Sequence, residues 1–230
     1  MLFYGIDSTY LLLVLPAIIL AFWAQANVQS TFKKYSKVSV HGMSGYDSAR
    51  AILDANGLNN VRIERVSGSL TDHYDPKANV IRLSDSVYSA TNAAAVGVAA
   101  HEAGHAVQHA VGYTPIKIRS AIIPITNIGS NLAMPLLLLG ILFSYPTLAY
   151  VGVAAFGLST IFQLVTLPVE FNASNRAMDA LKSGGRLTVE ETTAASKVLR
   201  AAALTYVAAL AVSLANLLRL FSIARRSSRN

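Results

Sequence analysis

The residues whose types and spacing are best suited to chemistry are His101, Glu102 and His105, in the sequence His-Glu-Ala-Gly-His. Histidines four residues apart lie on one face of a helix, one turn from each other, so both imidazoles can bind a single Zn²⁺. Zinc lowers the pKa of a bound water molecule, and the glutamate between the histidines is placed to accept its proton. We therefore predict metal-assisted hydrolysis, with His101 and His105 as zinc ligands and Glu102 as the catalytic general base, which is the HExxH pattern of metalloproteases. The alternative is a helix that carries two surface histidines and a solvated glutamate.

A catalytic zinc ion takes three protein ligands, so the third must come from elsewhere in the chain. His109 lies on the same helical face, but eight residues of continuous helix place it about 12 Å from His101, too far to share one ion. His41, His73 and the acidic residues remain as candidates.

Among the acidic residues, Glu170 is favoured as the third metal ligand. It begins the segment Glu-Phe-Asn-Ala-Ser just after an apolar stretch, and in zinc peptidases with a glutamate ligand that residue lies on a second helix downstream. Ser174, four residues further on, is placed to hydrogen-bond a ligand histidine. The alternative is that Glu170 is an ordinary acid near a helix N-terminus, where the macrodipole favours negative charge.

The elements that must position these residues lie between apolar segments. A long helix is expected over Ala90–Val111, a helix capped by Ser44 over Gly45–Ala55, and strands over Asn60–Val66 and Val80–Leu83. Four apolar stretches of about 18–24 residues are each long enough to span a bilayer as a helix; they are Thr9–Ala26, Ser120–Phe143, Thr147–Val169 and Ala201–Ile223. Two of them separate His105 from Glu170, so the chain returns to the same side of the membrane before Glu170.

The composition supports this division. The 230 residues are 53% hydrophobic and 13% charged, about half the charged share of a soluble domain, which argues against a soluble enzyme and against a disordered chain. There is no cysteine, which excludes disulfides, thiolate-bound zinc and a thiol nucleophile. The net charge of +7 is spread over loops without interleaved aromatic residues, so a nucleic-acid partner is not expected.

We therefore expect a mainly α integral membrane protein with about four transmembrane helices and a small α+β zincin-like catalytic insertion that carries the HExxH helix. The predicted parts are a first transmembrane helix (1–28), the α+β catalytic unit (29–115), a transmembrane helical hairpin (116–169), a helical segment with the third ligand (170–200), and a last transmembrane helix with a basic tail (201–230). Gly184-Gly185 should separate two helices in the fourth part.

Several longer motifs resemble those of membrane zinc metallopeptidases of the YugP type. They are HEAGHAVQH at 101–109, the segments Leu70–Tyr88 and Leu167–Met178, and the apolar segment Ala203–Leu210. The resemblance covers nearly the whole chain and implies a neutral zinc metallopeptidase with His101, His105 and Glu170 as ligands and Glu102 as base. The chain is more distantly similar to the HtpX and CAAX-protease group, which is gluzincin-like. Ser174 stands where that wider group has aspartate, so the charge that would support a ligand histidine is missing.

Two finer expectations concern the substrate. Zinc peptidases often pair an edge strand with the substrate backbone, and Val80–Ser84 is the candidate for that strand; the alternative is a strand paired only within its own domain. Tyr88 and Tyr206 are candidates for stabilising the oxyanion, although packing is an equally ordinary role for a tyrosine.

The basic residues predict the orientation in a bacterial-type plasma membrane. Fifteen Lys and Arg residues lie on the catalytic side and four on the other side, so the positive-inside rule places the active site in the cytoplasm; the four are Arg219, Arg225, Arg226 and Arg229. The sequence Ala24-Gln25-Ala26 resembles a signal-peptidase site, but no basic residue precedes the apolar run.

The predicted function is therefore a membrane-embedded zinc-dependent endopeptidase that hydrolyses peptide bonds in peptides or membrane proteins at the lipid bilayer. The alternative is a non-cleaving zinc-binding membrane chaperone or assembly factor. A transporter is disfavoured, because the apolar segments hold no ionisable residue except Arg219. The oligomeric state cannot be predicted.

Overall fold

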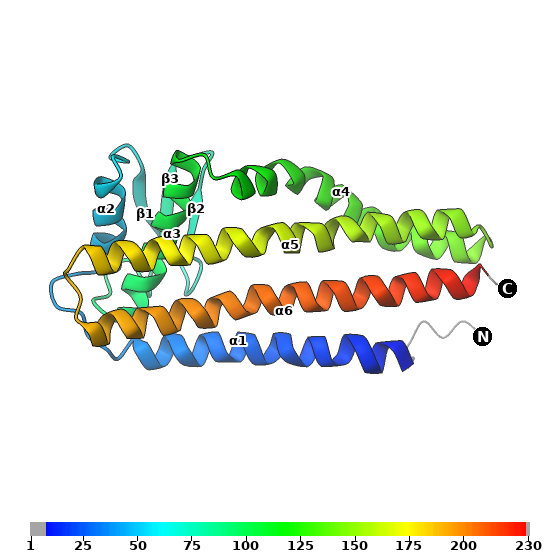
Figure 1. Ribbon diagram of the computed structural model, residues 1–230, viewed down its shortest axis with the longest axis horizontal. Coiled ribbons are helices and arrows are strands. Elements are labelled where there is room, and N and C mark those ends of the chain that lie inside the picture. The colour runs from blue at the N-terminus through cyan, green and yellow to red at the C-terminus, as the bar shows by residue number, and fades with distance from the viewer. Residues whose placement is uncertain (1–7, 229–230) are drawn as a thin grey trace. The chain divides into compact units, whose positions relative to one another are not determined.

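The computed structural model describes residues 8–228, which are mainly helical with one small sheet (Figure 1). Two short ends lie outside the described residues: residues 1–7, at the start of the predicted first transmembrane part (1–28), and residues 229–230, which include Arg229 of the predicted basic tail. The chain divides into two compact units. We call Met1–Ala24, Ile118–Leu167 and Thr205–Asn230 the helical unit, and Gln25–Lys117 and Pro168–Leu204 the mixed unit.

Four long helices contribute to the helical unit. They are α1 (Leu15–Tyr35), preceded by a π-helical turn at Tyr10–Val14, α4 (Thr114–Leu142), α5 (Pro146–Ser183) and α6 (Val189–Ser227). Each is long and apolar enough to cross a membrane, which confirms the predicted number of candidate spans. Large apolar side chains of this unit remain exposed, including Leu12 (75%) and Phe22 (73%). Such surfaces are unfavourable in water and suit a lipid environment.

Close approach of backbones holds α4 against α5 within the helical unit. The two helices are joined by residues 143–145, and Gly140 faces the backbone of Ala149 where α5 begins. A side chain at Gly152 would lie 2.6 Å from the nitrogen of Leu137, so only glycine fits. Small residues at helix contacts are typical of packing in membranes, where backbones rather than long side chains meet.

The mixed unit contains a three-stranded sheet with the order β1-β3-β2. Strand β1 (Arg62–Val66) pairs in parallel with β3 (Val80–Ser84), and β2 (His73–Asp75) pairs antiparallel with the other side of β3. The prediction that Val80–Ser84 pairs with a substrate is therefore wrong, because β1 and β2 already occupy both edges of β3. The edge strands are β1 and β2, and the sequence analysis did not predict β2.

Two shorter helices pack together beside the sheet in the mixed unit (Figure 1). Helix α2 (Gly45–Ala55) has the predicted bounds and a capping box in which Ser44 and Asp47 bond each other's backbone N–H groups. Helix α3 (Ala93–Ala110) is capped by the preceding residue Asn92, whose side chain accepts a hydrogen bond from the N–H of Ala95. Its many alanines, from Ala93 to Ala106, are buried, so neighbouring backbones can approach α3 closely.

The later parts of α5 and α6 complete the core of the mixed unit. Ala177 and Leu181 of α5 and Ala195 and Leu199 of α6 pack in one apolar cluster with α2, α3 and the sheet. Helix α5 ends at Ser183 and α6 begins at Val189, which confirms the predicted break at Gly184-Gly185. The first turns of α5 in this unit therefore lie against α3.

Candidate metal centre

Gly104, inside the HExxH segment, lets α5 come close to α3. A Cβ atom at this position would lie 2.6 Å from the carbonyl oxygen of Ala173, a distance that real Cβ contacts do not reach. Because glycine lacks that atom, the backbone of α5 packs directly against the HExxH helix. The contact places Glu170, about one turn before Ala173, and Ser174, the residue directly after Ala173, opposite the two histidines.

Three side chains converge at this contact. The Nε2 atoms of His101 and His105 lie 3.2 and 3.4 Å from Oε2 of Glu170, and one ligand atom from each residue lies within 4.8 Å of the other two. Glu170 is 3% exposed, and the two imidazole rings meet edge to face with 4.6 Å between centroids. Two imidazole nitrogens and one carboxylate oxygen, close together and shielded from water, form a donor set that fits a catalytic Zn²⁺ with one position left open.

The electrostatics of the pocket favour a positive charge. Burial lowers the pKa of His105, but its hydrogen bond with Glu170 and the charges of Glu102 and Glu170 outweigh burial and raise that pKa above its usual value. The same acidic groups that attract a proton to His105 would attract a metal cation there.

Each of the two histidines has a second hydrogen-bond partner at its Nδ1 atom. Nδ1 of His101 lies 3.0 Å from the hydroxyl of Ser174, the residue for which the sequence predicted this place. Nδ1 of His105 lies 3.0 Å from Oε1 of Gln108, a fully buried residue that the sequence analysis passed over. Partners of this kind orient imidazoles towards a metal.

Glu102 lies beside the cluster and is held from the other side of α3. Its Oε2 accepts a hydrogen bond of 2.9 Å from the backbone N–H of Tyr74, in the middle of strand β2. Glu102 is 9% exposed and is not one of the three grouped ligands. The Glu102 carboxylate is therefore separate from the three grouped ligand atoms, although Glu102 lies on the same turn of α3 as the two histidines.

Asp72 anchors the beginning of β2 and thereby the position of Tyr74. Its carboxylate accepts hydrogen bonds from the N–H of Ser84 (2.7 Å) and from the Ser84 hydroxyl (2.9 Å). Burial raises the pKa of Asp72, the two bonds from Ser84 oppose that rise, and the negative charge of Glu102 adds to it. No local pattern predicted Asp72 or Tyr74, because a three-residue strand is too short to show alternation.

The other histidines considered from the sequence lie elsewhere. His109 packs against the ring of Tyr74 with 5.5 Å between centroids, and Nδ1 of His73 lies 2.9 Å from the carbonyl oxygen of Thr71. His41 is exposed in a turn. None of these three belongs to the group formed by His101, His105 and Glu170.

The two tyrosines considered for the oxyanion differ in their surroundings. Tyr88 packs against Tyr46 with 5.3 Å between ring centroids, which agrees with a packing role. Tyr206 belongs to the part of α6 in the helical unit. An oxyanion-stabilising role for either residue stays a prediction.

Comparison with known proteins agrees with this geometry. A family model described as "Putative neutral zinc metallopeptidase" matches residues 10–225. The chain is 47% identical over 215 residues to the "Putative membrane protease YugP" of Bacillus subtilis (strain 168), across 93% of this chain and 96% of that protein. No solved structure matches the chain significantly.

Proposed function

Because this chain belongs to the neutral zinc metallopeptidase family, we propose that it is an integral membrane zinc-dependent endopeptidase. The observation that carries the proposal is the convergence of His101, His105 and Glu170 with Glu102 beside them. The four apolar helices and the membrane protease among its relatives support the membrane location.

In the proposed mechanism, His101, His105 and Glu170 hold Zn²⁺ and Glu102 moves the proton. When bound, zinc supplies Lewis acidity, which makes water easier to deprotonate and polarises a peptide carbonyl. Oε2 of Glu102 is held by the N–H of Tyr74, so Oε1 is the atom that accepts the proton of the attacking water. The water oxygen then bonds to the carbonyl carbon, the C–N bond breaks, and Glu102 returns the proton to the departing amine nitrogen.

The substrate backbone would lie along β2 and not along β3, which the sequence predicted for this role but which is the central strand of the sheet. Strand β2 lies at the edge of the sheet, and its Tyr74 contacts the proposed base directly. Extended peptides commonly bind by adding a strand to such an edge. Because the N–H of Tyr74 is already bonded to Glu102, the substrate would pair with the other outward-facing backbone groups of β2. The substrates would be peptides or segments of membrane proteins close to the bilayer.

The proposed location is a bacterial-type plasma membrane with the active site on the cytoplasmic side, as the distribution of Lys and Arg indicates. The absence of cysteine allows a clean test, because single cysteines can be labelled without background. In intact cells, a membrane-impermeant thiol reagent should label Ser228→Cys and should label Ser69→Cys only after permeabilisation. Labelling of Ser69→Cys in intact cells would reverse the orientation.

The activity is tested with purified protein. Glu102→Gln should keep its zinc and lose peptide cleavage, while Glu170→Ala should lose zinc. Unchanged cleavage by Glu102→Gln would overturn the role of Glu102, and undiminished zinc in Glu170→Ala would remove Glu170 from the ligand set. If the unsubstituted protein bound zinc but cleaved no peptide, the alternative of a non-cleaving chaperone or assembly factor would be favoured. The position of Glu102 argues against that alternative, because zinc binding alone needs no general base.

A further inference from the structure

A chain of hydrogen bonds, buried near His105 and part-buried at Asn172, leads from His105 of α3 to Arg176 of α5. Oε1 of Gln108 contacts Nδ1 of His105 (3.0 Å), and Nε2 of Gln108 donates to the carbonyl oxygen of Val169 (2.8 Å) and to Oδ1 of Asn172 (3.0 Å). The same Oδ1 atom accepts a bond of 2.8 Å from Nε of Arg176. Both polar atoms of the Gln108 amide therefore meet a partner, although Gln108 is fully buried.

The groups at two points of this chain determine the direction of every bond in it. The guanidinium of Arg176 can only donate, so the amide oxygen of Asn172 must face it. The carbonyl of Val169 can only accept, so the NH₂ group of Gln108 must face that carbonyl. A reversed amide at Gln108 would place two oxygens against each other at Val169 and again at Asn172.

One protonation pattern of His105 follows from these directions. With its NH₂ group committed, Gln108 presents an oxygen to His105, so Nδ1 of His105 must carry a hydrogen and donate it. Without metal, Nε2 faces the Glu170 carboxylate and can donate a hydrogen to it; when a metal takes the place of that hydrogen, the one on Nδ1 stays and the lone pair of the neutral ring is on Nε2. His101 differs, because the Ser174 hydroxyl can donate or accept and leaves both tautomers of His101 open.

We propose that Gln108, Asn172 and Arg176 act as positioning residues that fix His105 in the tautomer able to bind metal through Nε2. The proposal rests on the proposed function, since it concerns one of the three zinc ligands. It makes His105 the prearranged ligand of the pair, whereas His101 has to select its tautomer when metal binds. Such outer partners typically change metal affinity by about 10- to 100-fold.

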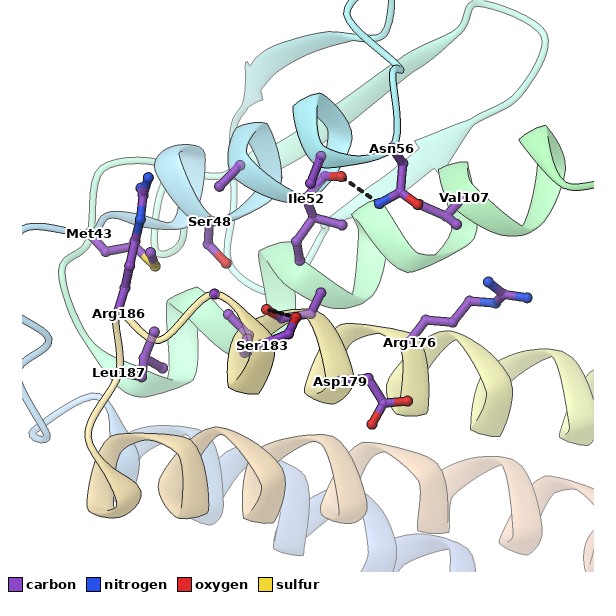
Figure 2. Close-up of a pocket in the computed structure, with 15 residues that line it drawn as sticks. Met43, Ser48, Ile52, Asn56, Val107, Arg176, Asp179, Ser183, Arg186 and Leu187 are labelled. Carbon is purple, nitrogen blue, oxygen red and sulfur yellow. Dashed lines mark hydrogen bonds between the residues drawn. The ribbon is translucent and has the colours of Figure 1, made fainter.

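Arg176, at the far end of the chain, also lines a cavity of about 670 Å³ between α2, α3 and α5 (Figure 2). In Figure 2 the Arg176 side chain extends from α5 past Val107 of α3, and its guanidinium lies at the rim rather than among the apolar side chains. Removal of this side chain would thus leave a space that a small cation can enter from solvent, which allows a rescue experiment.

The test measures zinc affinity of the full-length protein in detergent, by competition with a chromogenic chelator, with circular dichroism to verify folding. Gln108→Leu should weaken zinc binding by about 10- to 100-fold, and Asn172→Leu should do the same through Gln108. Asn172→Asp is the matched control, because both groups that face Oδ1 are donors; its affinity should stay within about threefold of the unsubstituted protein. Arg176→Ala should weaken binding, and a low, non-denaturing concentration of guanidinium should restore it, whereas guanidinium should not improve Ser174→Ala.

A second measurement is independent of zinc. In metal-free protein with ¹⁵N-labelled histidine, Nδ1 of His105 should be protonated, whereas in Gln108→Leu the hydrogen on Nδ1 should be lost in favour of Nε2, which faces Glu170. Unchanged zinc affinity and an unchanged tautomer in folded Gln108→Leu would overturn the positioning role while leaving the zinc site intact. Failure of the unsubstituted protein to bind zinc would instead contradict the proposed function, so the two failures are distinguishable.

Discussion

The two sides of helix α3 hold the candidate site in different ways. On the α5 side, His101 and His105 face Glu170, and each histidine has a further partner at its Nδ1 atom. On the sheet side, Glu102 depends on one backbone N–H, that of Tyr74 in a three-residue strand. The comparison indicates that the proposed metal ligands and the proposed base, neighbours on one helix, are held by different parts of the mixed unit.

This separation has a physical reason. Metal ligands need fixed distances, which two long helices packed through a glycine can supply. A general base must stay close to the metal without binding it, and a neutral N–H donor from the sheet keeps Glu102 in place without adding charge. We therefore expect changes on the α5 side to affect zinc affinity first, and changes on the sheet side to affect turnover.

The largest effect is expected from Gly104→Ala. Its added methyl group would meet the carbonyl oxygen of Ala173 at 2.6 Å, so α3 and α5 must separate and Glu170 must move away from the histidines. We predict that zinc binding weakens by at least about 100-fold, which is the largest loss typical when a hydrogen-bond partner of a metal ligand is removed. Competition with a chelator measures this affinity.

Gly97→Ala is the matched control on the same helix. There the added methyl group would meet Cβ of Ala195 at 3.2 Å, a contact that a small shift relieves, and α6 rather than α5 is the neighbour. Zinc affinity should stay near that of the unsubstituted protein. Equal losses in the two variants would mean that general loosening of α3, rather than the approach of α5, controls the site.

On the sheet side, Tyr74→Pro removes the N–H that holds Glu102. Proline is tolerated in an edge strand where the missing N–H does not belong to the ladder, and this N–H faces Glu102 instead of β3. We predict a fall in kcat of about tenfold, the equivalent of one lost hydrogen bond to a charged group, with zinc affinity unchanged. Peptide cleavage at saturating zinc measures the effect.

Tyr74→Phe serves as the control for that variant, because it keeps the N–H and loses only the hydroxyl contact with Asn79 (3.3 Å). Its kcat should match the unsubstituted protein. If Tyr74→Pro lowered zinc affinity as much as kcat, the two sides of α3 would not be separate.

The part of the site that follows helical spacing could be predicted from the sequence. His101 and His105, like Glu170 and Ser174, are four residues apart, and each pair lies along one helix face. The helix cap at Ser44 also depends on neighbouring residues only, and α2 begins directly after Ser44, as the sequence predicted.

Contacts between distant segments could not be predicted in this way. Gln108 is an ordinary polar residue in the sequence, and only the packing of α5 shows that it meets Asn172. The apolar run that begins at Val80, after the turn residues Asp75-Pro76, indicates a strand but does not reveal which strands flank it. The change from apolar to polar residues at Glu170 suggested a boundary, yet α5 continues, since backbone hydrogen bonds of a helix do not depend on side-chain polarity.

A smaller effect on the α5 side is expected from Ser174, which is the only partner recorded at Nδ1 of His101 within residues 8–228. Ser174→Ala should weaken zinc binding by about tenfold, the lower limit for loss of an outer partner. Ser174→Asp should bind zinc more tightly than Ser174→Ala, because a carboxylate accepts from Nδ1 and adds a negative charge. Equal affinities of these two variants would show that the hydroxyl does not support His101.

The smallest effect should come from Asp47, which stabilises α2 and touches neither side of the site. Hydrogen bonds from the hydroxyl and the N–H of Ser44 lower the pKa of Asp47. A carboxyl whose folded pKa lies below its unfolded value of about 3.9 contributes stability that is complete above that value and is lost as the pH falls through the folded pKa.

At neutral pH, Asp47→Ala should lower the thermal midpoint in detergent by about 2–4 °C, corresponding to about 1 kcal/mol for a cap. The difference from the unsubstituted protein should shrink below about pH 4, whereas Ser44→Ala, which also loses the hydroxyl bond to the Asp47 N–H, should remain less stable there. Zinc affinity and kcat should not change in Asp47→Ala, and a change in either would mean that the stability of α2 reaches the site through its packing on α3.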